Sequence, residues 1–395
     1  MTAMATPIAP QVLLPAEKLA RLRLARSENV GPITFRQLLE RYGSAEAALA
    51  ALPELARRGG RKRPIRITPA GAAEDEAAAL EAFGAELLVL GELGYPARLA
   101  EIEDAPPAIS LLGHRHVLDQ PSVAMVGARN ASANGRRLAE RLATDLGAAG
   151  FAVASGLARG IDAAAHRGAL ETGTAAVVAG GLDVVYPEEN RALYEEIVAR
   201  GLVLSEMPPG TVPQSRHFPR RNRLISGLSL GAVVVEATLR SGSLITARFA
   251  LEQGREVFAV PGSPMDPRAR GCNRLLRQGA GLVESAEDVV EVVNRILASP
   301  LREPPQVPLA GDRPAARPLA DEAETEATRA TVESLLGPDP VTVDELARTG
   351  ELALPLLQQV LLELELAGRI ERHPGQKVAL ALSPESPKSS ADSGG

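Results

Sequence analysis

Six short apolar runs recur along the middle of the chain, and amphipathic segments with glycine-containing turns separate them. Near-continuous apolar strands that alternate with helices are typical of a parallel sheet buried on both faces. The runs are Val123–Val126, Phe151–Ala154, Ala175–Val178, Leu202–Leu204, Ala232–Glu236 and Val257–Val260. The pattern therefore predicts an α/β fold over residues 90–298, with a Rossmann-like, doubly wound and mostly parallel sheet.

The segment before this pattern, residues 10–70, consists of short amphipathic stretches broken at Val30-Gly31-Pro32 and at Tyr42-Gly43-Ser44. Glycine and proline at these points end one helix and begin the next. We expect an N-terminal helical unit of the helix-hairpin-helix or sterile-alpha-motif type. Hairpins of this kind often contact nucleic-acid backbones, but many serve only in packing, and both readings stay open.

After the α/β pattern, residues 299–328 are rich in proline and then acidic, without periodicity, as in a linker. Three helical stretches and two short strands around Gly375 follow, and this order predicts a winged-helix-like unit at 329–382. Its third helix, Pro355–Ala367, has no basic residue and two glutamates. Because a helix that reads a DNA groove needs basic or amide side chains, we expect this unit to contact protein. The tail, 383–395, is expected to be disordered.

Charge is distributed unevenly along the chain. The 395 residues carry a formal net charge of −6, yet residues 121–290 hold 19 arginines, no lysine and 17 acidic residues. The middle of the chain is therefore net +2 and the flanks are net −8. Planar guanidinium groups suit bidentate recognition of phosphate, so we expect the basic surface on the α/β domain.

Several classes of protein are disfavoured by the sequence. The single cysteine, Cys272, excludes an intrachain disulfide and a cysteine-only metal cluster, and no two of the five histidines have zinc-ligand spacing. We therefore expect no metal and no cofactor. The N-terminus lacks the pattern of a signal peptide, and no apolar run is long enough to span a membrane. A cytoplasmic protein with no membrane partner is the expectation.

The segment Ser215–Ser229 concentrates positive charge around an aromatic side chain and then turns apolar. Its basic residues are Arg216, Arg220, Arg221 and Arg223, and they surround Phe218. Guanidinium groups bind phosphate oxygens, and an aromatic ring offers a stacking face to an unpaired base. The combination indicates a polyanion and favours single-stranded nucleic acid.

Glycine-bearing loops follow several of the predicted strands, at the edge where a doubly wound sheet places its ligands. They are Gly127–Gly135, the turn at Ser155-Gly156, Ser241–Thr246 and Pro261–Ser263. The first and third open helices, whose free N–H groups attract phosphate; capping by Ser132 or Asn134 is the alternative reading of the first. Glu236, at a strand end on this rim, is the best candidate to hydrogen-bond a base or sugar.

Asp162 and His166 lie four residues apart in the segment after the second strand, so they share a helix face. A catalytic pair is one interpretation. A structural hydrogen bond that fixes the helix is the interpretation we favour.

Seven segments in order resemble the DNA-processing protein A (DprA, also called Smf) family. They are GARNASANG, SGLARGIDAAAH, GGLDVVYPEEN, SEMPPGT, HFPRRNRLISGLS, VVVEATLRSGSLITARFALEQGREVFAVPG and GCNRLLRQGA. The resemblance implies a single-stranded-DNA-binding protein of natural transformation, without catalysis. It also implies that the protein protects incoming strands, helps to load the recombinase RecA and forms a homodimer through the Rossmann-like domain.

The resemblance also implies a set of DNA-binding residues. The family's pocket uses the glycine–arginine loop after the first strand and a Phe-Pro-x-Arg-Asn-Arg segment. Transferred to this chain, with the neighbouring loops added, the predicted set is Gly127, Arg129, Gly156, His217, Phe218, Arg220, Arg221, Asn222, Arg223, Ser241, Gly242 and Ser243. Ala128 and Asn134 stand where the family often has a serine and an aromatic, so a hydroxyl and a stacking ring are missing there.

Two other functions are compatible with parts of the sequence. Nucleoside-monophosphate phosphoribohydrolases of the lysine-decarboxylase-like type resemble this chain near Arg240–Thr246, but a threonine stands here where their catalytic glutamate is expected. A duplex-DNA regulator that uses the winged-helix-like unit is the third reading, and the acidic third helix argues against it.

Overall fold

The structure is a computed structural model that describes residues 8–298, 322–373 and 375–381. Contacts divide the chain into two compact units. The first, here called the Rossmann-like unit, comprises the described residues of Met1–Leu22 and Ala70–Gly311. The second, here called the terminal unit, combines Arg23–Pro69 with the described residues of Asp312–Gly395. Segments from both ends of the sequence thus form one unit, which the sequence did not predict.

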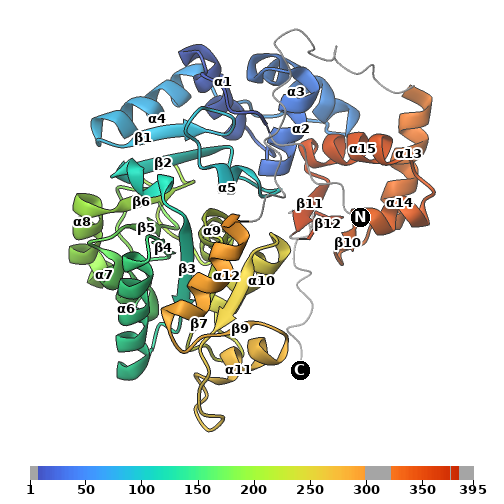
Figure 1. Cartoon of the computed structure of the whole chain (residues 1–395). Helices are drawn as coiled ribbons and strands as arrows, with labels where there is room; N and C mark the ends of the chain where they lie inside the picture. Colours follow the sequence, from blue (N-terminus) through green and yellow to red (C-terminus); the bar gives the residue numbers. More distant parts are fainter. Residues whose placement is uncertain (1–7, 299–321, 374, 382–395) are drawn as a thin grey trace, which may run out of the picture. The chain divides into compact units, whose positions relative to one another are not determined.

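The Rossmann-like unit is built on a nine-stranded sheet with the order β1-β2-β6-β5-β4-β3-β7-β8-β9. The strands from β6 to β9 run parallel, whereas β1 pairs with β2 and β2 with β6 in antiparallel fashion (Figure 1). The strands are β1 (Glu86–Val89), β2 (Ala108–Gly113), β3 (Ser122–Gly127), β4 (Ala152–Ser155), β5 (Thr174–Val177), β6 (Leu202–Ser205), β7 (Gly231–Val235), β8 (Glu256–Ala259) and β9 (Gly281–Leu282).

The predicted mostly parallel sheet is confirmed, and each of the six predicted strands lies within one or two residues of an observed one. The expectation missed β1, β2 and β9. The last is only two residues long, and the first two precede the alternating strand–helix pattern from which the sheet was inferred. They extend the sheet beyond β6 by antiparallel pairing, for which no crossover helix is needed.

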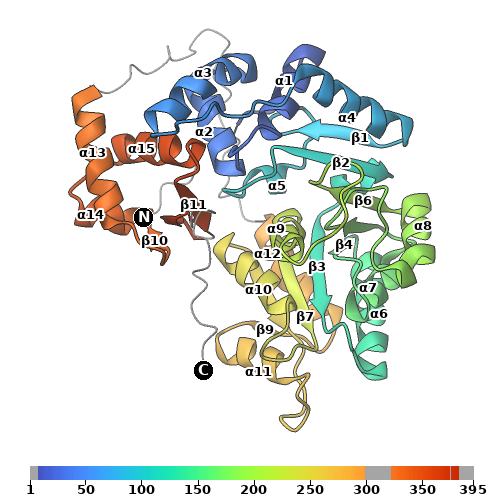
Figure 2. The same cartoon turned by 180° about the vertical axis from the view of Figure 1, so that it is seen from behind.

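Helices cover both faces of the sheet. One face packs against α6, α7 and α12 through a core that includes Leu142, Leu146, Ile161 and Val289, and α9 and α10 contact the strands from the other side (Figure 2). The helices of this unit are α4 (Ala70–Ala82), α5 (Ala97–Ala100), α6 (Ala133–Ala148), α7 (Ile161–Ala169), α8 (Arg191–Arg200), α9 (His217–Leu228), α10 (Ser243–Glu252), α11 (Arg270–Arg277) and α12 (Ala286–Ala298), and α1 (Pro15–Ala25) crosses the boundary between the units.

The strand order reverses direction between β3 and β7. The chain proceeds from β3 outward to β4, β5 and β6, then returns to β7 on the other side of β3. The loops that follow β3 and β7 therefore diverge onto opposite faces and leave a crevice at their carboxyl ends, which is where doubly wound sheets bind ligands.

The terminal unit contains the N-terminal hairpin and the winged helix. Its elements are α2 (Pro32–Tyr42), α3 (Ala45–Arg58), α13 (Glu322–Leu335), β10 (Val341–Thr342), α14 (Val343–Thr349), α15 (Leu354–Leu366), β11 (Ile370–His373) and β12 (Lys377–Leu380). The predicted breaks at Gly31 and Gly43 and the predicted winged-helix order are confirmed. The expected linker is corrected at its end, because 322–328 are helical; 299–321 and the expected disordered tail lie outside the described residues.

The described residues contain neither a membrane-spanning helix nor a cluster of metal ligands. No helix there is both long and apolar enough to cross a membrane. No three histidine, cysteine or acidic side chains in that part of the chain gather in a way that could hold a metal ion.

Candidate nucleic-acid interface

Two adjoining cavities open at the carboxyl ends of β3, β4 and β7, in the crevice set by the strand order. The smaller is about 350 Å³ and the larger about 450 Å³. They share Arg129, Ala158, Phe218 and Arg221, so they form one continuous groove. The smaller cavity is completed by the segment around Tyr186, and the larger by the loops after β3 and β7.

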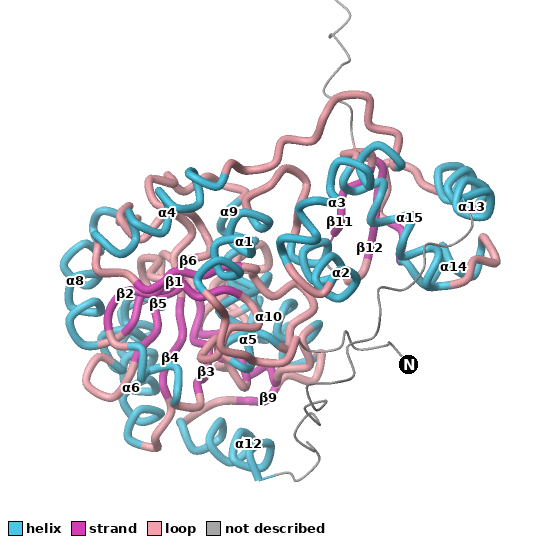
Figure 3. Tube along the Cα trace, turned by 90° about the horizontal axis from the view of Figure 1, so that it is seen from above, coloured by secondary structure: helices cyan, strands magenta, loops and turns pink. Residues whose placement is uncertain are grey.

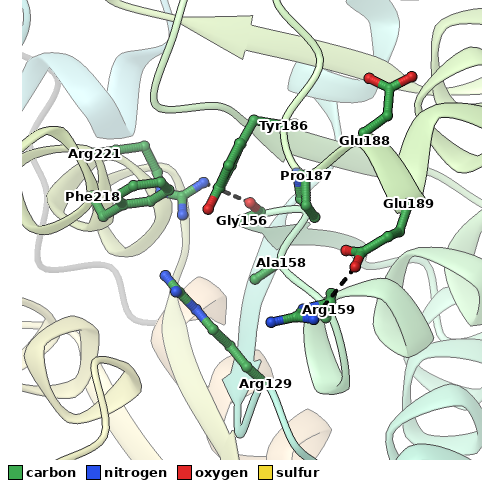
Figure 4. Close-up of a pocket in the computed structure, with 10 residues that line it drawn as sticks. All are labelled: Arg129, Gly156, Ala158, Arg159, Tyr186, Pro187, Glu188, Glu189, Phe218 and Arg221. Carbon is green, nitrogen blue, oxygen red and sulfur yellow. Dashed lines mark hydrogen bonds and ion pairs between the residues drawn. The ribbon is translucent and has the colours of Figure 1, made fainter. Parts of the chain in front are cut away.

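An aromatic side chain lies where the two cavities meet. The Phe218 ring packs against the Tyr186 ring at 5.5 Å and an interplanar angle of 53°. The guanidinium of Arg129 lies 5.3 Å from the centre of the same ring. Figure 4 shows Tyr186 and Phe218 beside one another, with Arg129 and Arg159 extending into the same space. Arg129 is exposed, and no carboxylate partner for it is found among the described residues.

Arg221 forms the floor of both cavities. Its guanidinium donates to the carbonyl oxygens of Gly156, at 2.7 Å, and Val177. Desolvation lowers the pKa of Arg221 to about 10, and the carboxylate of Asp162 opposes that shift. A Cβ on Gly156 would lie 2.7–2.8 Å from the Arg221 guanidinium, which explains the glycine at this position. Arg221 is buried, so it joins α9 to the ends of β4 and β5 and adds positive potential beneath the groove.

Arg223, two residues further along α9, points away from the groove. Its guanidinium pairs with Glu206 and lies 3.5 Å from a carboxylate oxygen of Asp104. Both Arg223 and Glu206 have side chains only 4% exposed. This burial argues against the predicted phosphate contact of Arg223, because its guanidinium would first have to leave a buried ion pair. Arg220 is exposed but also pairs with Glu206, at 3.1 Å.

The helix N-terminus after β3 already holds an anion from the chain itself. Ser132 caps α6 by accepting from the Gly135 N–H at 2.9 Å. The Ser132 N–H donates to Glu236 at 2.8 Å, and the Ser132 hydroxyl donates to the other oxygen of the same carboxylate. Glu236 adopts a φ of 52°, in the left-handed region. The Glu236 carboxylate therefore completes the cap, which argues against the predicted phosphate at this helix end and against the predicted base contact of Glu236.

The N-terminus of α10 is arranged differently. Gly242 occupies the cap position without a side-chain cap, and the hydroxyls of Ser241 and Ser243 lie 2.7 Å apart. Asn222 of α9 donates to the carbonyl of Gly242 at 3.4 Å, which ties this loop to the basic segment. All four residues line the larger cavity. Small side chains and a helix N-terminus leave this wall suitable for a phosphate.

Asp162 and His166 do not bond to each other. Asp162 accepts from the Ala158 N–H at 3.3 Å, and desolvation raises its pKa although Arg221 lowers it. Nδ1 of His166 lies 2.7 Å from the hydroxyl of Thr174, which itself donates to the Val153 carbonyl. Nδ1 therefore carries the proton, and desolvation lowers the His166 pKa to about 3. His166 thereby ties α7 to β5 and β4, whereas Asp162 closes the turn that leads into α7.

The structure gathers most of the predicted residues in the groove and leaves three outside it. Those that line it are Gly127, Arg129, Gly156, Phe218, Arg221, Asn222, Ser241, Gly242 and Ser243, while His217, Arg220 and Arg223 line neither cavity. The nitrogen Nδ1 of His217 accepts from the Gln214 N–H at 3.2 Å.

Sequence reasoning missed three basic or aromatic side chains of the groove. Tyr186 and Arg159 line the smaller cavity, and Arg268 lines the larger. The signal for the first two was available, since both belong to segments that resemble the DprA family, but neither lies in a basic cluster. Arg268 lies in an irregular loop after β8, for which no pattern gave a position.

Three family models match the chain. "DNA recombination-mediator protein A" covers residues 86–294, "DprA-like N-terminal HHH domain" covers 15–79 and "DprA winged helix domain" covers 313–376. DNA processing protein DprA of Streptococcus pneumoniae is 48% identical over 198 residues, which are 50% of this chain and 70% of that protein.

Two solved structures show the same fold at higher than 25% identity. The X-ray structure of DprA from Streptococcus pneumoniae superposes with a TM-score of 0.59 and 36% identity, covering 71% of this chain and 98% of that one. A structure of DNA processing protein A from Helicobacter pylori, which describes a single-stranded DNA binding mode, has a TM-score of 0.50 and 28% identity. It covers 54% of this chain and 96% of that one.

Proposed function

The chain belongs to the DprA/Smf family of DNA-processing proteins, and we propose that its Rossmann-like unit binds single-stranded DNA in the groove between β3 and β7, without catalysis. One observation carries this proposal: Phe218 contacts both the ring of Tyr186 and the exposed guanidinium of Arg129, on the wall of a groove. An unpaired base can stack on such a surface while a cation beside it meets the phosphate.

The groove offers a path for the backbone as well as a place for a base. Arg129 and Arg159 line the smaller cavity and Arg268 the larger, and the α10 N-terminus at Ser241–Ser243 forms the far wall. Arg159 and Arg268 pair with Glu189 and Asp266, but their side chains are 57% and 41% exposed. Such surface pairs are weak enough for a phosphate to replace the carboxylate.

Binding without chemistry is supported by the state of the titratable groups beside the groove. Asp162 and His166 have separate structural partners, and Glu236 completes a helix cap. None of these three side chains is placed as a base beside a nucleophile. Release of free base from a nucleoside monophosphate by the purified protein would contradict this part of the proposal.

Fluorescence anisotropy with labelled single-stranded and duplex oligonucleotides over a series of NaCl concentrations tests the binding itself. Three phosphate contacts would give a log–log salt slope of about −2 for a single strand. We expect a strong preference for the single strand, since a base in a duplex cannot reach Phe218. Equal affinity for duplex, or affinity independent of salt, would refute the proposal.

Two finer roles form part of the same proposal. In the cytoplasm, where chromosomal DNA is recombined, the protein would protect incoming single strands and help to load the recombinase RecA, acting as a homodimer through the Rossmann-like unit. Family membership supports both roles. RecA filament growth on strands already covered by single-strand-binding protein tests the role in RecA loading. Light scattering in solution tests the homodimer. A monomer at all concentrations would overturn the dimer without affecting the groove.

A further inference from the structure

The third helix of the winged unit, α15, is buried on two faces. Leu357, Val360, Leu361 and Leu364 form one i, i+3, i+4, i+7 face, which packs into the winged unit's own core. A second face with the same spacing, Gln359, Leu362, Glu363 and Leu366, does not belong to that core. Yet Leu362, Glu363 and Leu366 are at most 3% exposed. A helix that enters a DNA groove must leave one face open, so α15 is not presented in that way.

The N-terminal hairpin covers this second face. α15 contacts both α3 and α2, and the three helices lie together in Figure 3. Arg41 of α2 donates to Oε1 of Gln359 at 3.5 Å. The backbone of Gly59, at the end of α3, is so close to α15 that a Cβ there would lie 2.0 Å from the Glu363 carbonyl oxygen and 2.8 Å from the Ala367 Cβ.

The hairpin turn is held by the end of the same helix. Asn29, beside the turn, donates to the Leu366 carbonyl at 3.1 Å across 337 residues of sequence. A Cβ on Gly31 would lie 3.4 Å from Oε1 of Glu365. A carboxylate from α15 therefore lies beside the N-terminus of α2, where a helix-hairpin-helix would receive a DNA phosphate. This carboxylate, which accepts from Arg372 at 2.7 Å, stands beside the turn where a phosphate would have to enter, so the turn is unsuited to a phosphate while α15 is docked.

A buried ion pair orders the winged unit's side of this contact. Glu363 is fully buried on the second face, and Arg329 of α13 pairs with it at 2.7 Å. Gln359, one turn earlier, donates to the other oxygen of Glu363 at 3.2 Å. A buried carboxylate that has lost these partners is strongly destabilising, so the pair holds α13 and α15 in one arrangement beneath the face that the hairpin covers.

We infer that the N-terminal hairpin and the winged helix are docking surfaces for each other, and that this mutual burial excludes both from nucleic acid. The partner of the winged unit is the hairpin of the same chain. Two of the family models treat this region as two separate domains, at 15–79 and 313–376, whereas the contacts make it one module with a composite core. This inference does not depend on what the groove of the Rossmann-like unit binds.

Hydrogen exchange of the full-length protein, with and without oligonucleotides, tests the exclusion. We expect neither a single strand nor a duplex to protect the amides of 29–42 or 354–366, while a single strand protects 127–132 and 217–222. Protection of the hairpin or of α15 by either oligonucleotide would overturn the inference. If a single strand fails to protect 127–132 and 217–222 while the hairpin and α15 also stay unprotected, the proposed function is overturned and this inference stands.

Adding one methyl group where the hairpin touches α15 tests the docking. Gly59 has a φ of −66° and a ψ of 1°, which alanine adopts without strain, so Gly59→Ala acts only through the clash with α15. Gly337→Ala in the winged unit is the matched control, because nothing lies within 4 Å of a Cβ there. We expect Gly59→Ala to raise exchange about tenfold or more in both 32–42 and 354–366, as overpacked contacts do, with no change in the control.

The two segments must respond together. Faster exchange in the hairpin alone, or in neither segment, would mean that they are not one module. If Gly59→Ala proves too unstable to purify, Leu362→Ala gives the same test by removing apolar contact, and the same joint response is required.

Discussion

Removing Arg129 is the sharpest test of the groove, because this guanidinium has two separable contributions. Its charge is exposed, and its plane lies 5.3 Å from the Phe218 ring centre. One phosphate contact on a single strand contributes about 0.7 to the log–log salt slope, so at roughly 0.1 M salt it is worth about fivefold in affinity. The cation–π contact that orients Phe218 adds about 0.5–1 kcal/mol, or roughly two- to fivefold.

Arg129→Ala should therefore weaken single-strand binding by about 10- to 30-fold and make the salt slope shallower by about 0.7. Arg129→Lys should keep the slope, since the charge remains, but lose part of the affinity, since an ammonium group does not stack on an aromatic ring as a guanidinium does. The measurement is anisotropy with a labelled single strand at several salt concentrations.

The matched control is Arg248→Ala. Arg248 also lies over a phenylalanine, with its guanidinium 5.5 Å from the Phe249 ring centre, and its side chain is 58% exposed. It lines neither cavity. Equal losses in the two alanine variants would show a diffuse effect of charge, and an unchanged affinity in Arg129→Ala would refute the placement of the strand across Phe218.

Three further outcomes are expected. Tyr186→Ala should cost single-strand binding about 1–3 kcal/mol while leaving the salt slope unchanged, because a base loses a stacking surface but no phosphate loses its cation; a changed slope in the same titrations would contradict a stacking role. Glu206→Ala should lower the free energy of unfolding in urea by about 3 kcal/mol, because it leaves Arg223 buried with only Asp104 nearby; a loss below about 1 kcal/mol would show that the pair is not needed. Burial lowers the pKa of His166 to about 3, so its contribution to stability is complete above the unfolded pKa of about 6.5 and is lost as the pH falls from there toward 3. Unfolding free energy should drop by about 1.4 kcal/mol between pH 7.5 and 5.5 through this residue, and His166→Gln should lack that component; identical pH profiles would rule it out.

The fold was predictable where a local pattern carries the information. Strands buried on both faces must be apolar at nearly every position, and six such runs marked β3 to β8. The position of the groove followed from the same pattern, since loops after parallel strands emerge at one edge of the sheet. The pattern therefore predicts that Gly127, Arg129 and Ser241–Ser243 lie together, and both cavities include residues of this set.

Arg221 and Arg223 show what a local pattern leaves undecided. Both belong to one basic run, but residues two apart on a helix point in nearly opposite directions. Arg221 turns toward Gly156 at the groove, and Arg223 turns toward Glu206. Gly156 lies 65 residues from Arg221 in sequence, and Glu206 lies 17 residues from Arg223. Composition alone could therefore not distinguish a groove residue from a structural ion pair.

The sequence by itself determined the strands, the helices and the edge of the sheet where a ligand binds, because these depend on the periodicity of neighbouring residues. Tertiary structure alone decided which charges remain available. Glu236 hydrogen-bonds to a helix cap 104 residues away, and α15 packs against a hairpin more than 300 residues away. Burial of a polar group is favourable only when a partner of matching geometry faces it, and that partner is chosen by the packing of distant segments.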